Sequence, residues 1–314
     1  MASDYGIVIH GGAGTILKEK MTPEREVQYR EKLTASLRTG YDILENGGKA
    51  LDAVQAAVKV MEDSPLFNAG KGAVFTNDGK NEQDACIMDG RTLNSGAVAG
   101  VRQIKNPIDL ARAVMDKSEH ILLAAEGAEA FAKLHGIEFA DADYFYTEER
   151  WKQLQAAKYK EKMTQTDYSQ LDHSDDKHGT VGAVALDRHG DLAAATSSGG
   201  MTNKKFGRLG DSLIVGAGNY ANNRTCAVSG TGHGEYFITG VVSYDVSALM
   251  EYRGLSVEQA ADMVVHEKLG RLGGTGGLIA IDRAGNFAMP FNTPGMYRGH
   301  LLKRQAPVVM IFQE

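Results

Sequence analysis

Residues 178–193 read HGTVGAVALDRHGDLA, and this stretch carries most of the information about the fold. Residues 181–186 are small and apolar, as in a short strand that is buried on both faces. A similar stretch, GLIAIDRAGNFA, occupies residues 277–288. Each predicts an apolar strand, a turn around Asp-Arg-x-Gly and a returning strand. Two such hairpins with helices between them indicate an α+β protein in which helices cover two sheets.

Other elements follow from apolar spacing and from helix-capping residues. Thr22 and Pro23 form a typical helix start, because Thr caps the first turn and Pro tolerates the first helical position. The helical pattern continues to Glu45 and stops before a glycine pair. We expect further helices at 50–61, from 107 onward, at 121–134 and at 258–269, and strands at 6–10, 73–76, 86–88 and 97–101.

Composition narrows the class of protein. The 314 residues include 34 Lys and Arg against 40 Asp and Glu, a formal net charge of −6. This mild acidity argues against a nucleic-acid partner, and no apolar run approaches the ~18 residues of a membrane span. The first residues lack the positive charge of a secretory signal, and two cysteines are too few for a disulfide scaffold. We therefore expect a cytoplasmic protein without a membrane partner.

The character of the chain changes at residue 148. Thirteen of the thirty residues from 148 to 177 are charged, and no apolar period continues past Leu154. Such a stretch is typical of a long surface connector that is functional or disordered. We expect a mobile, charged linker over about 148–179 that ends at Gly179, directly before Thr180.

If Thr180 became a chain terminus, it would supply both a nucleophile and a general base. Its Oγ could attack a carbonyl while the freed α-amine takes the proton, and such an amine titrates near ~7.7–8.0. Before any cut, the same oxygen could attack the Gly179 carbonyl. The junction alone is better explained by a threonine that merely starts a strand, because Thr favours strands.

Several common catalytic motifs do not occur in the sequence. There is no Gly-x-Ser-x-Gly elbow, no Gly-x-Gly-x-x-Gly after a strand, no Walker A sequence and no zinc-ligand spacing. We therefore expect no organic cofactor.

Seven sequence motifs, taken together, indicate one protein family. They are HGGAG (10–14), LFNAG (66–70), DACIMDG (84–90), HGTVG (178–182), ATSSGGMTNK (195–204), GRLGD (207–211) and TGHG (231–234). In type, order and spacing, the chain resembles the plant-type L-asparaginase/isoaspartyl peptidase family of N-terminal-nucleophile hydrolases over nearly its full length. The resemblance implies a four-layer αββα sandwich.

The resemblance also implies a mode of maturation and a reaction. The precursor would cut itself before Thr180, giving a larger subunit of residues 1–179 and a smaller one of 180–314 that fold as one unit, and two cleaved units would pair as a dimer. Thr180 would form an acyl-enzyme while it hydrolyses L-asparagine to L-aspartate and ammonia. It would cleave β-aspartyl dipeptides in the same way.

Further roles are implied for residues that match the family motifs. Thr231 and the Gly232 amide would stabilise the oxyanion. Arg208 suits the substrate α-carboxylate, Asp211 suits its α-ammonium, and Gly234 supplies a close backbone contact.

Three more positions would support the nucleophile. Ser198 stands where the family usually has a threonine that hydrogen-bonds it, Thr202 would line its pocket, and Asn68 would position chain near the cleavage site. His10 is expected to be a packing residue, because the threonine amine makes a histidine base unnecessary.

Residues 61–71 resemble the family's stabilisation loop, in which backbone carbonyls hold a sodium ion. The matching residues are Met61, Glu62, Ser64, Phe67, Ala69 and Lys71.

Two alternatives to this function remain at this point. A glycosylasparaginase shares the threonine, but its pattern has Asp where this chain has Gly179. A non-catalytic amino-acid-binding protein that keeps the uncut form is the other, because Ser198 departs from the usual residue.

Overall fold

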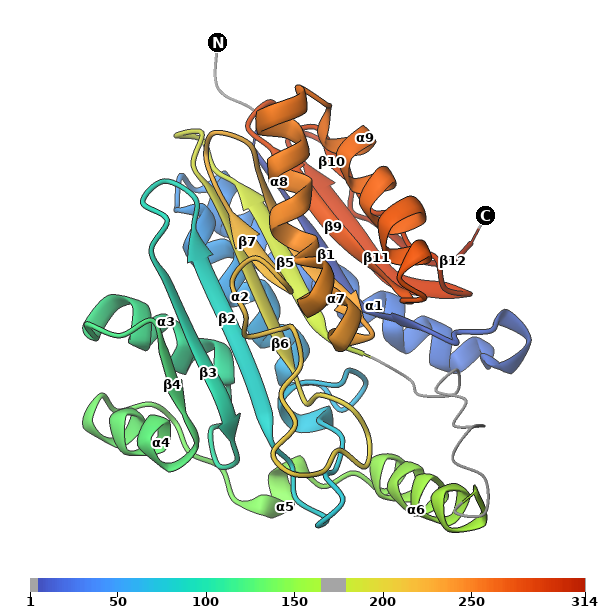
Figure 1. The fold of residues 1–314 in the computed structure, drawn as a ribbon. Helices are drawn as coiled ribbons and strands as arrows, with labels where there is room; N and C mark the ends of the chain where they lie inside the picture. The colour runs from blue at the N-terminus through green and yellow to red at the C-terminus, as the bar shows by residue number, and fades with distance from the viewer. Residues whose placement is uncertain (1–4, 165–178, 314) are drawn as a thin grey trace.

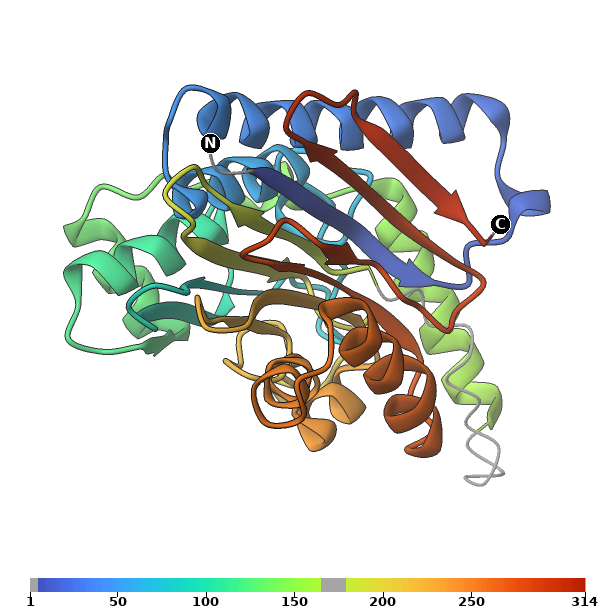
Figure 2. The same ribbon diagram turned by 90° about the horizontal axis from the view of Figure 1, so that it is seen from above.

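The fold consists of two β-sheets that lie face to face, with helices over both outer faces (Figure 1). A computed structural model describes residues 5–164 and 179–313. The larger sheet has eight strands in the order β12-β11-β1-β5-β6-β2-β3-β4, and the smaller has four in the order β10-β9-β8-β7. The view from above in Figure 2 separates the layers into helix, sheet, sheet and helix. The predicted four-layer αββα sandwich is therefore confirmed.

The strands of the larger sheet are β1 (Gly6–Gly14), β2 (Gln83–Asp89), β3 (Ser95–Val101), β4 (Leu122–Ala124), β5 (Val181–Leu186), β6 (Leu192–Ser198), β11 (Gly295–Leu302) and β12 (Val308–Phe312). Those of the smaller sheet are β7 (Asn219–Ala221), β8 (Cys226–Gly232), β9 (Gly276–Asp282) and β10 (Phe287–Ala288). The helices are α1 (Pro23–Glu45), α2 (Ala50–Glu62), α3 (Pro107–Lys117), α4 (Ala125–Leu134), α5 (Ala142–Phe145), α6 (Glu148–Thr164), α7 (Gly234–Gly240), α8 (Val242–Arg253) and α9 (Val257–Asp262).

Helices α1 and α2 begin and end close to where the sequence predicts them. The Thr22 side chain accepts the Arg25 N–H at 3.3 Å, and Pro23 takes the first helical position. Both helices turn an apolar face to the larger sheet, and their buried residues join one core with β1, β2, β3 and β5. On the other side of the molecule, α8, α9 and a π-helical segment (Met263–Leu269) form a second core with β8 and β9.

A third core fills the space between the two sheets. Its side chains are apolar, and they include Val8 of β1, Val184 of β5, Ala227 of β8 and Ile279 of β9. Because β5 lies in the middle of the larger sheet, helix α2 covers one of its faces and the smaller sheet covers the other. Strand β5 is therefore enclosed by β1 and β6 at its edges, by α2 on one face and by the smaller sheet on the other.

The structure corrects the expected linker. Residues Glu148–Thr164 form helix α6, where we predicted a mobile connector. Leu154 is fully buried and Arg150 is 8% exposed, so two side chains anchor a helix that is otherwise charged and exposed. The rest of the expected linker, residues 165–178, lies outside the described residues.

Other predicted elements differ in detail. Residues 73–76 form no strand and contribute only an isolated bridge between Phe75 and Asn81. The helix expected over 121–134 is divided into strand β4 and helix α4, and Ala125 at the junction has a φ of +47°. The helix expected over 258–269 becomes π-helical after Asp262.

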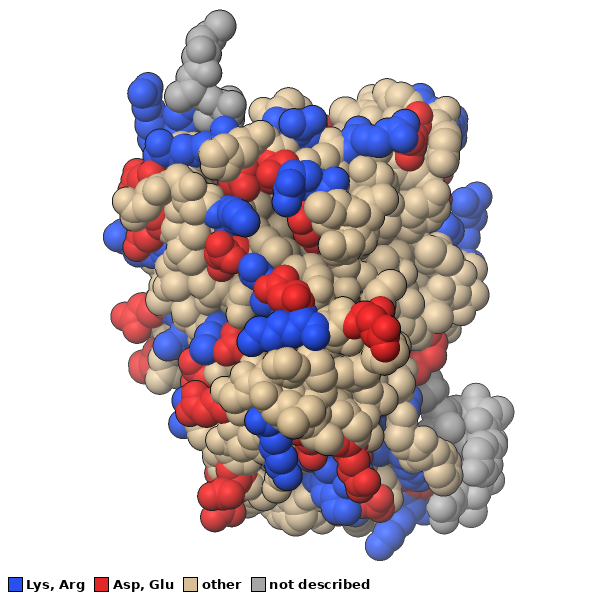
Figure 3. Space-filling view, turned by 90° about the vertical axis from the view of Figure 1, so that its left-hand side faces the viewer, with Lys and Arg blue, Asp and Glu red and all other residues tan. Residues whose placement is uncertain are grey.

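One face of the molecule shows how its surface charges are distributed. On the face drawn in Figure 3, basic and acidic side chains are interspersed. Within residues 5–164 and 179–313, no helix is both long enough and apolar enough to cross a membrane.

Candidate active site

Thr180 lies at the start of β5 and is almost entirely buried, with an exposed fraction of 5%. The antiparallel pairing of β5 and β6 sets Val181 opposite Ser197 and thereby brings Ser198 beside Thr180. The Thr180 Oγ donates to Ser198 Oγ at 3.0 Å, and Ser212 Oγ lies 3.5 Å away. Ser198 Oγ also accepts the Gly200 N–H at 2.9 Å, which fixes its position. Ser212 is a neighbour that no sequence motif singled out.

His10 holds the backbone of Thr180. Its Nδ1 lies 3.0 Å from the Thr180 carbonyl oxygen and its Nε2 lies 2.9 Å from Ser229 Oγ. Since a carbonyl only accepts, Nδ1 carries the proton, and Nε2 accepts from Ser229. Burial lowers the pKa of His10 to about 3, so the imidazole is neutral. His10 is buried, as expected of a packing residue, but it also makes a specific bond to Thr180.

Asn68 lies against the peptide that would be cut. Its Nδ2 donates to the Gly200 carbonyl at 2.7 Å, and its Oδ1 accepts the Val74 N–H at 2.9 Å. A Cβ added to Gly179 would stand 3.2 Å from the Asn68 Cβ. The close approach of residue 179 to Asn68 therefore favours glycine.

A small hollow of about 10 Å³ brings most of the remaining expected residues to Thr180. Its lining comprises Asp84, Gly179, Thr180, Ser198, Gly200, Arg208, Gly210, Asp211, Ser212 and Gly232. Thr231 and Thr202 are not among these residues. Thr231 is buried on the side of β1, where its Oγ accepts the Ala13 N–H at 3.2 Å.

Arg208 and Asp211 both line the hollow, but they differ in their hydrogen-bond partners. The Arg208 Nε and Nη2 donate to the two carboxylate oxygens of Glu235 at 2.9 and 2.8 Å. Asp211 is buried, and its Oδ2 has no partner among the described residues. Burial raises the pKa of Asp211 to about 7. A Cβ on Gly234 would lie 2.8 Å from Arg208 Nη2 and 2.9 Å from Asp211 Oδ1, so a side chain there would block the site.

Three charged residues near the hollow were given no role by the sequence. Glu235 occupies the Arg208 fork and also accepts from His233 Nε2 at 3.2 Å, and these hydrogen bonds hold its pKa below the usual range. Burial raises the pKa of Asp84, which lines the hollow and accepts the Gly100 N–H at 2.8 Å. Lys204 is also buried, and its Nζ donates to the Glu82 carbonyl at 2.9 Å. Asp84 and Lys204 lie within quoted motifs and Glu235 directly follows one, but their contacts join segments distant in sequence, so the motifs gave these residues no individual role.

The loop at 61–71 curls tightly on itself after α2. Gly70 has a φ of +55°, and a Cβ there would lie 2.2 Å from the Glu62 carbonyl oxygen. A Cβ on Gly72 would lie 2.1 Å from the Phe67 carbonyl oxygen. The Glu62 side chain is buried and accepts from Ser197 Oγ at 2.6 Å, and burial raises its pKa to about 8. No cluster of three or more His, Cys, Asp or Glu able to hold a metal occurs in the described part of the chain.

Known proteins are similar to this chain over almost its whole length. Residues 3–311 match the family model described as Asparaginase. An isoaspartyl peptidase of Escherichia coli (strain K12) is 54% identical over 310 residues, which cover 98% of this chain and 96% of the relative. An isoaspartyl peptidase/L-asparaginase of Danio rerio is 44% identical over 290 residues, 91% of this chain and 89% of the relative. A probable isoaspartyl peptidase/L-asparaginase 2 of Arabidopsis thaliana is 40% identical, with 94% and 95% covered. The chain therefore belongs to the asparaginase family whose model it matches.

Proposed function

We propose that this protein cuts itself between Gly179 and Thr180 and then hydrolyses L-asparagine and β-aspartyl dipeptides. The observation that carries the proposal is the Thr180 hydroxyl, bonded to Ser198 at 3.0 Å in a hollow that Arg208 and Asp211 also line. Relatives named isoaspartyl peptidase and isoaspartyl peptidase/L-asparaginase, at 54% and 44% identity, support this choice of substrates.

Self-cleavage begins with attack of the Thr180 Oγ on the Gly179 carbonyl. The C–N bond breaks, the Thr180 nitrogen takes a proton and becomes a free amine, and an ester joins Gly179 to the threonine oxygen. Water then hydrolyses the ester, which leaves a carboxylate on Gly179 and restores the hydroxyl. The products are a larger subunit of residues 1–179 and a smaller one of 180–314. Two hydrogen bonds support this geometry: His10 donates to the Thr180 carbonyl, and the Thr180 hydroxyl donates to Ser198 Oγ.

In turnover the free amine accepts the proton of Thr180 Oγ as the oxygen attacks the side-chain carbonyl of the substrate. The developing oxyanion requires fixed donors, for which we propose the Gly232 amide and Thr231. One such donor is typically worth ~2.7–4 kcal/mol of barrier. Collapse expels ammonia or the amine of the next residue, which leaves with the proton. Water then hydrolyses the aspartyl ester, releasing aspartate and regenerating the nucleophile.

Substrate recognition falls to Arg208, Asp211 and Gly234. The Arg208 fork suits the substrate α-carboxylate, which must share or displace the Glu235 carboxylate that now occupies it. The unpartnered Oδ2 of Asp211 suits the α-ammonium, whose positive charge favours ionisation of Asp211. We propose supporting roles for Ser198, which fixes the hydroxyl, for Asn68 beside Gly179, and for Thr202.

We also propose that backbone carbonyls of the loop at 61–71 bind a structural sodium ion. The curled backbone supports this, since Gly70 and Gly72 leave the carbonyls of Glu62 and Phe67 uncovered by any Cβ. The residues that would supply carbonyl oxygens are Met61, Glu62, Ser64, Phe67, Ala69 and Lys71.

We propose a cytoplasmic location and a dimer of cleaved units. Cys86 and Cys226 are both buried and unpaired, and free thiols suit a reducing compartment. The dimer stays a prediction, which light scattering of the cleaved protein would test.

The experiment that tests the proposed function is the intact mass and denaturing gel of fresh protein, repeated after a day at room temperature. We expect two fragments, one ending at Gly179 and one beginning at Thr180, together with aspartate release from L-asparagine and from a β-aspartyl dipeptide. A chain that stays whole and binds aspartate without turnover contradicts the proposal.

A further inference from the structure

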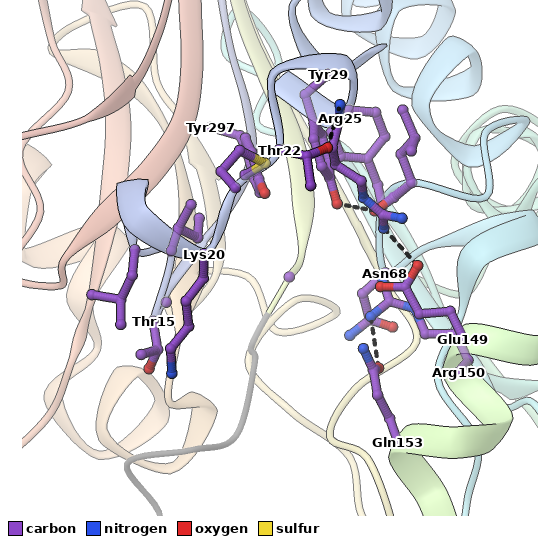
Figure 4. Close-up of a pocket in the computed structure, with 18 residues that line it drawn as sticks. Thr15, Lys20, Thr22, Arg25, Tyr29, Asn68, Glu149, Arg150, Gln153 and Tyr297 are labelled. Atoms are coloured by element: carbon purple, nitrogen blue, oxygen red, sulfur yellow. Dashed lines mark hydrogen bonds and ion pairs between the residues drawn. The ribbon is translucent and has the colours of Figure 1, made fainter. Parts of the chain in front are cut away.

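A second and larger cavity lies on the other side of Gly179. It encloses about 410 Å³, within the usual range for small-molecule sites. Gly179 is the one lining residue that it shares with the hollow around Thr180. Figure 4 shows Arg25, Arg150 and Gln153 on one wall, across from Thr15 and Lys20 on the other. We call this space the α6 cavity, because α6 contributes Glu149, Arg150 and Gln153 to its lining.

The charge of the α6 cavity is not balanced. Its lining holds three cationic side chains, Lys20, Arg25 and Arg150, against the one carboxylate of Glu149. Arg25 Nη2 is paired with Glu149 at 2.6 Å. The cavity is therefore suited to an anion.

Among the three cations Arg150 is the buried one, and it has no counter-charge within the described residues. Its side chain is nine-tenths buried, and its Nε and Nη1 donate only to neutral acceptors, the Gly72 carbonyl at 2.8 Å and Gln153 Oε1 at 3.0 Å. No carboxylate within the described residues pairs with it. A buried guanidinium is costly unless an anion compensates it, and a carboxylate matches its planar fork.

The wall of the α6 cavity next to α1 is apolar and aromatic. Tyr29 and Tyr297 stack with ring centroids 4.1 Å apart, and Phe67 packs edge-on against Tyr29 at 5.6 Å. Leu66 and Ile16 extend this apolar surface within the same lining. The cavity thus combines a cation for a carboxylate with an apolar wall for a side chain.

We propose that the α6 cavity binds the residue that follows the β-aspartyl group of a dipeptide substrate, with the α-carboxylate of that residue on Arg150. This inference rests on the proposed function. The aspartyl group belongs in the hollow with Arg208 and Asp211, so the amine that leaves must lie on another side of Thr180. In the uncut chain the hollow holds only about 10 Å³. Departure of Gly179 after cleavage makes room for substrate and joins the hollow to the α6 cavity.

The first test varies the substrate and leaves the cleaved wild-type protein unchanged. The kcat/KM for β-aspartyl-leucine is compared with that for its C-terminal carboxamide, which lacks the negative charge. We expect at least a tenfold preference for the free acid. Equal values overturn the inference, as they would if the freed Gly179 carboxylate held Arg150 instead. If the wild type hydrolyses neither dipeptide nor L-asparagine, the proposed function fails. If L-asparagine is hydrolysed but the carboxylate has no effect, only this inference fails.

The second test changes the cation. Arg150→Gln should lower the ratio of kcat/KM for β-aspartyl-leucine to that for L-asparagine at least tenfold, because ammonia does not reach the α6 cavity. It should also remove the preference for free acid over amide, and Arg150→Lys should restore part of it. The matched control is Lys152→Gln on the same helix, whose side chain is 74% exposed and should change neither ratio. Equal losses on both substrates would assign Arg150 a structural role and overturn the inference.

Discussion

Two hairpins of this chain, β5–β6 and β9–β10, have similar sequences and the same turn, yet only β5–β6 carries the proposed nucleophile. In each turn an aspartate Oδ1 accepts two backbone N–H groups. Asp187 accepts those of His189 and Asp191 at 2.9 and 3.0 Å, and Asp282 accepts those of Ala284 and Asn286 at 2.8 and 2.9 Å. The two turns even touch, because Arg283 Nε donates to the Gly190 carbonyl at 2.7 Å.

The similarity extends to the residue that precedes each hairpin. Gly179-Thr180 stands before β5, and Gly274-Thr275 stands before β9. Thr180 is buried and its hydroxyl meets Ser198, whereas Thr275 is exposed and its carbonyl accepts the His233 N–H at 2.9 Å. The difference comes from the sheets. β5 lies between β1 and β6 in the middle of eight strands, while β9 is next to the two-residue edge strand β10. The same Gly-Thr sequence is therefore suited to catalysis only where the surrounding strands bury and orient the threonine hydroxyl.

The strongest test of this comparison replaces the two threonines in turn. Thr180→Ala should abolish self-cleavage and lower asparagine hydrolysis by about 10⁴-fold or more, since removal of a nucleophile leaves only binding and oxyanion contributions. Thr275→Ala should cut itself and turn over normally, because its side chain is exposed. A denaturing gel and an ammonia assay measure both. Hydrolysis by Thr180→Ala, or an uncut Thr275→Ala, would show that the two sites differ less than their surroundings indicate.

A smaller loss is expected on the second strand of the same hairpin, where Ser198 of β6 lies beside Thr180. Ser198→Ala removes the oxygen that accepts the Thr180 hydroxyl at 3.0 Å and the Gly200 N–H at 2.9 Å. Leaving a buried hydroxyl without its partner costs about 1–3 kcal/mol, which corresponds to roughly a fivefold to hundredfold fall in kcat. Ser198→Thr keeps the hydroxyl and is the control, expected to stay within a few-fold of wild type. Steady-state kinetics with L-asparagine distinguishes them, and an unchanged kcat in Ser198→Ala would remove Ser198 from the mechanism.

The sequence predicted what depends on local pattern and on whole motifs. Both hairpins and the bounds of α1 and α2 follow from apolar periodicity, caps and turn residues, and the motifs brought Thr180, Ser198, Arg208 and Asp211 together in one hollow. The sequence did not predict helix α6, because eight of its seventeen residues are charged and only Arg150 and Leu154 are buried among its described side chains. The burial of these two residues depends on segments that are distant in sequence, such as Gly72, whose carbonyl accepts from Arg150.

Contacts between distant segments were also beyond prediction. The Arg208–Glu235 pair and the bond from His10 to Thr180 span 27 and 170 positions, and neither leaves a local signal. The break of 121–134 at Ala125 depends on pairing of β4 with β3, which likewise is a tertiary interaction.

The buried acid beside the Thr180 end of β5–β6 gives a pH dependence of about tenfold per unit. Burial raises the pKa of Asp211 to about 7, so below pH 7 the free site holds a neutral acid that does not attract an ammonium. The affinity for L-aspartate should therefore rise as pH increases from 5 to 7 and then level off. Succinate has both carboxylates but no ammonium, and the affinity for its dianion, corrected for its own ionisation, should show no such rise.

Calorimetric titration of the cleaved protein with both ligands measures this difference. The ratio of the two affinities cancels the effect of the Thr180 amine, which acts on the carboxylates of both. Asp211→Asn should flatten the ratio. Parallel pH profiles for aspartate and succinate would show that Asp211 does not contact the ammonium.

The smallest effects are expected in the two turns, where the hairpins are most alike. Gly190 and Gly285 have φ values of +80° and +86°, a region that costs an L-residue about 1–2 kcal/mol. Each glycine-to-alanine variant should therefore lower Tm by a few degrees in a thermal melt while leaving kcat/KM for L-asparagine unchanged. Gly190→Ala should lose more, because its Cβ would lie 2.9 Å from Arg283 Nη2, at the contact between the two turns. A larger loss in Gly285→Ala, or a loss of activity in either variant, would mean that the turns are not equivalent and that their contact contributes little to stability.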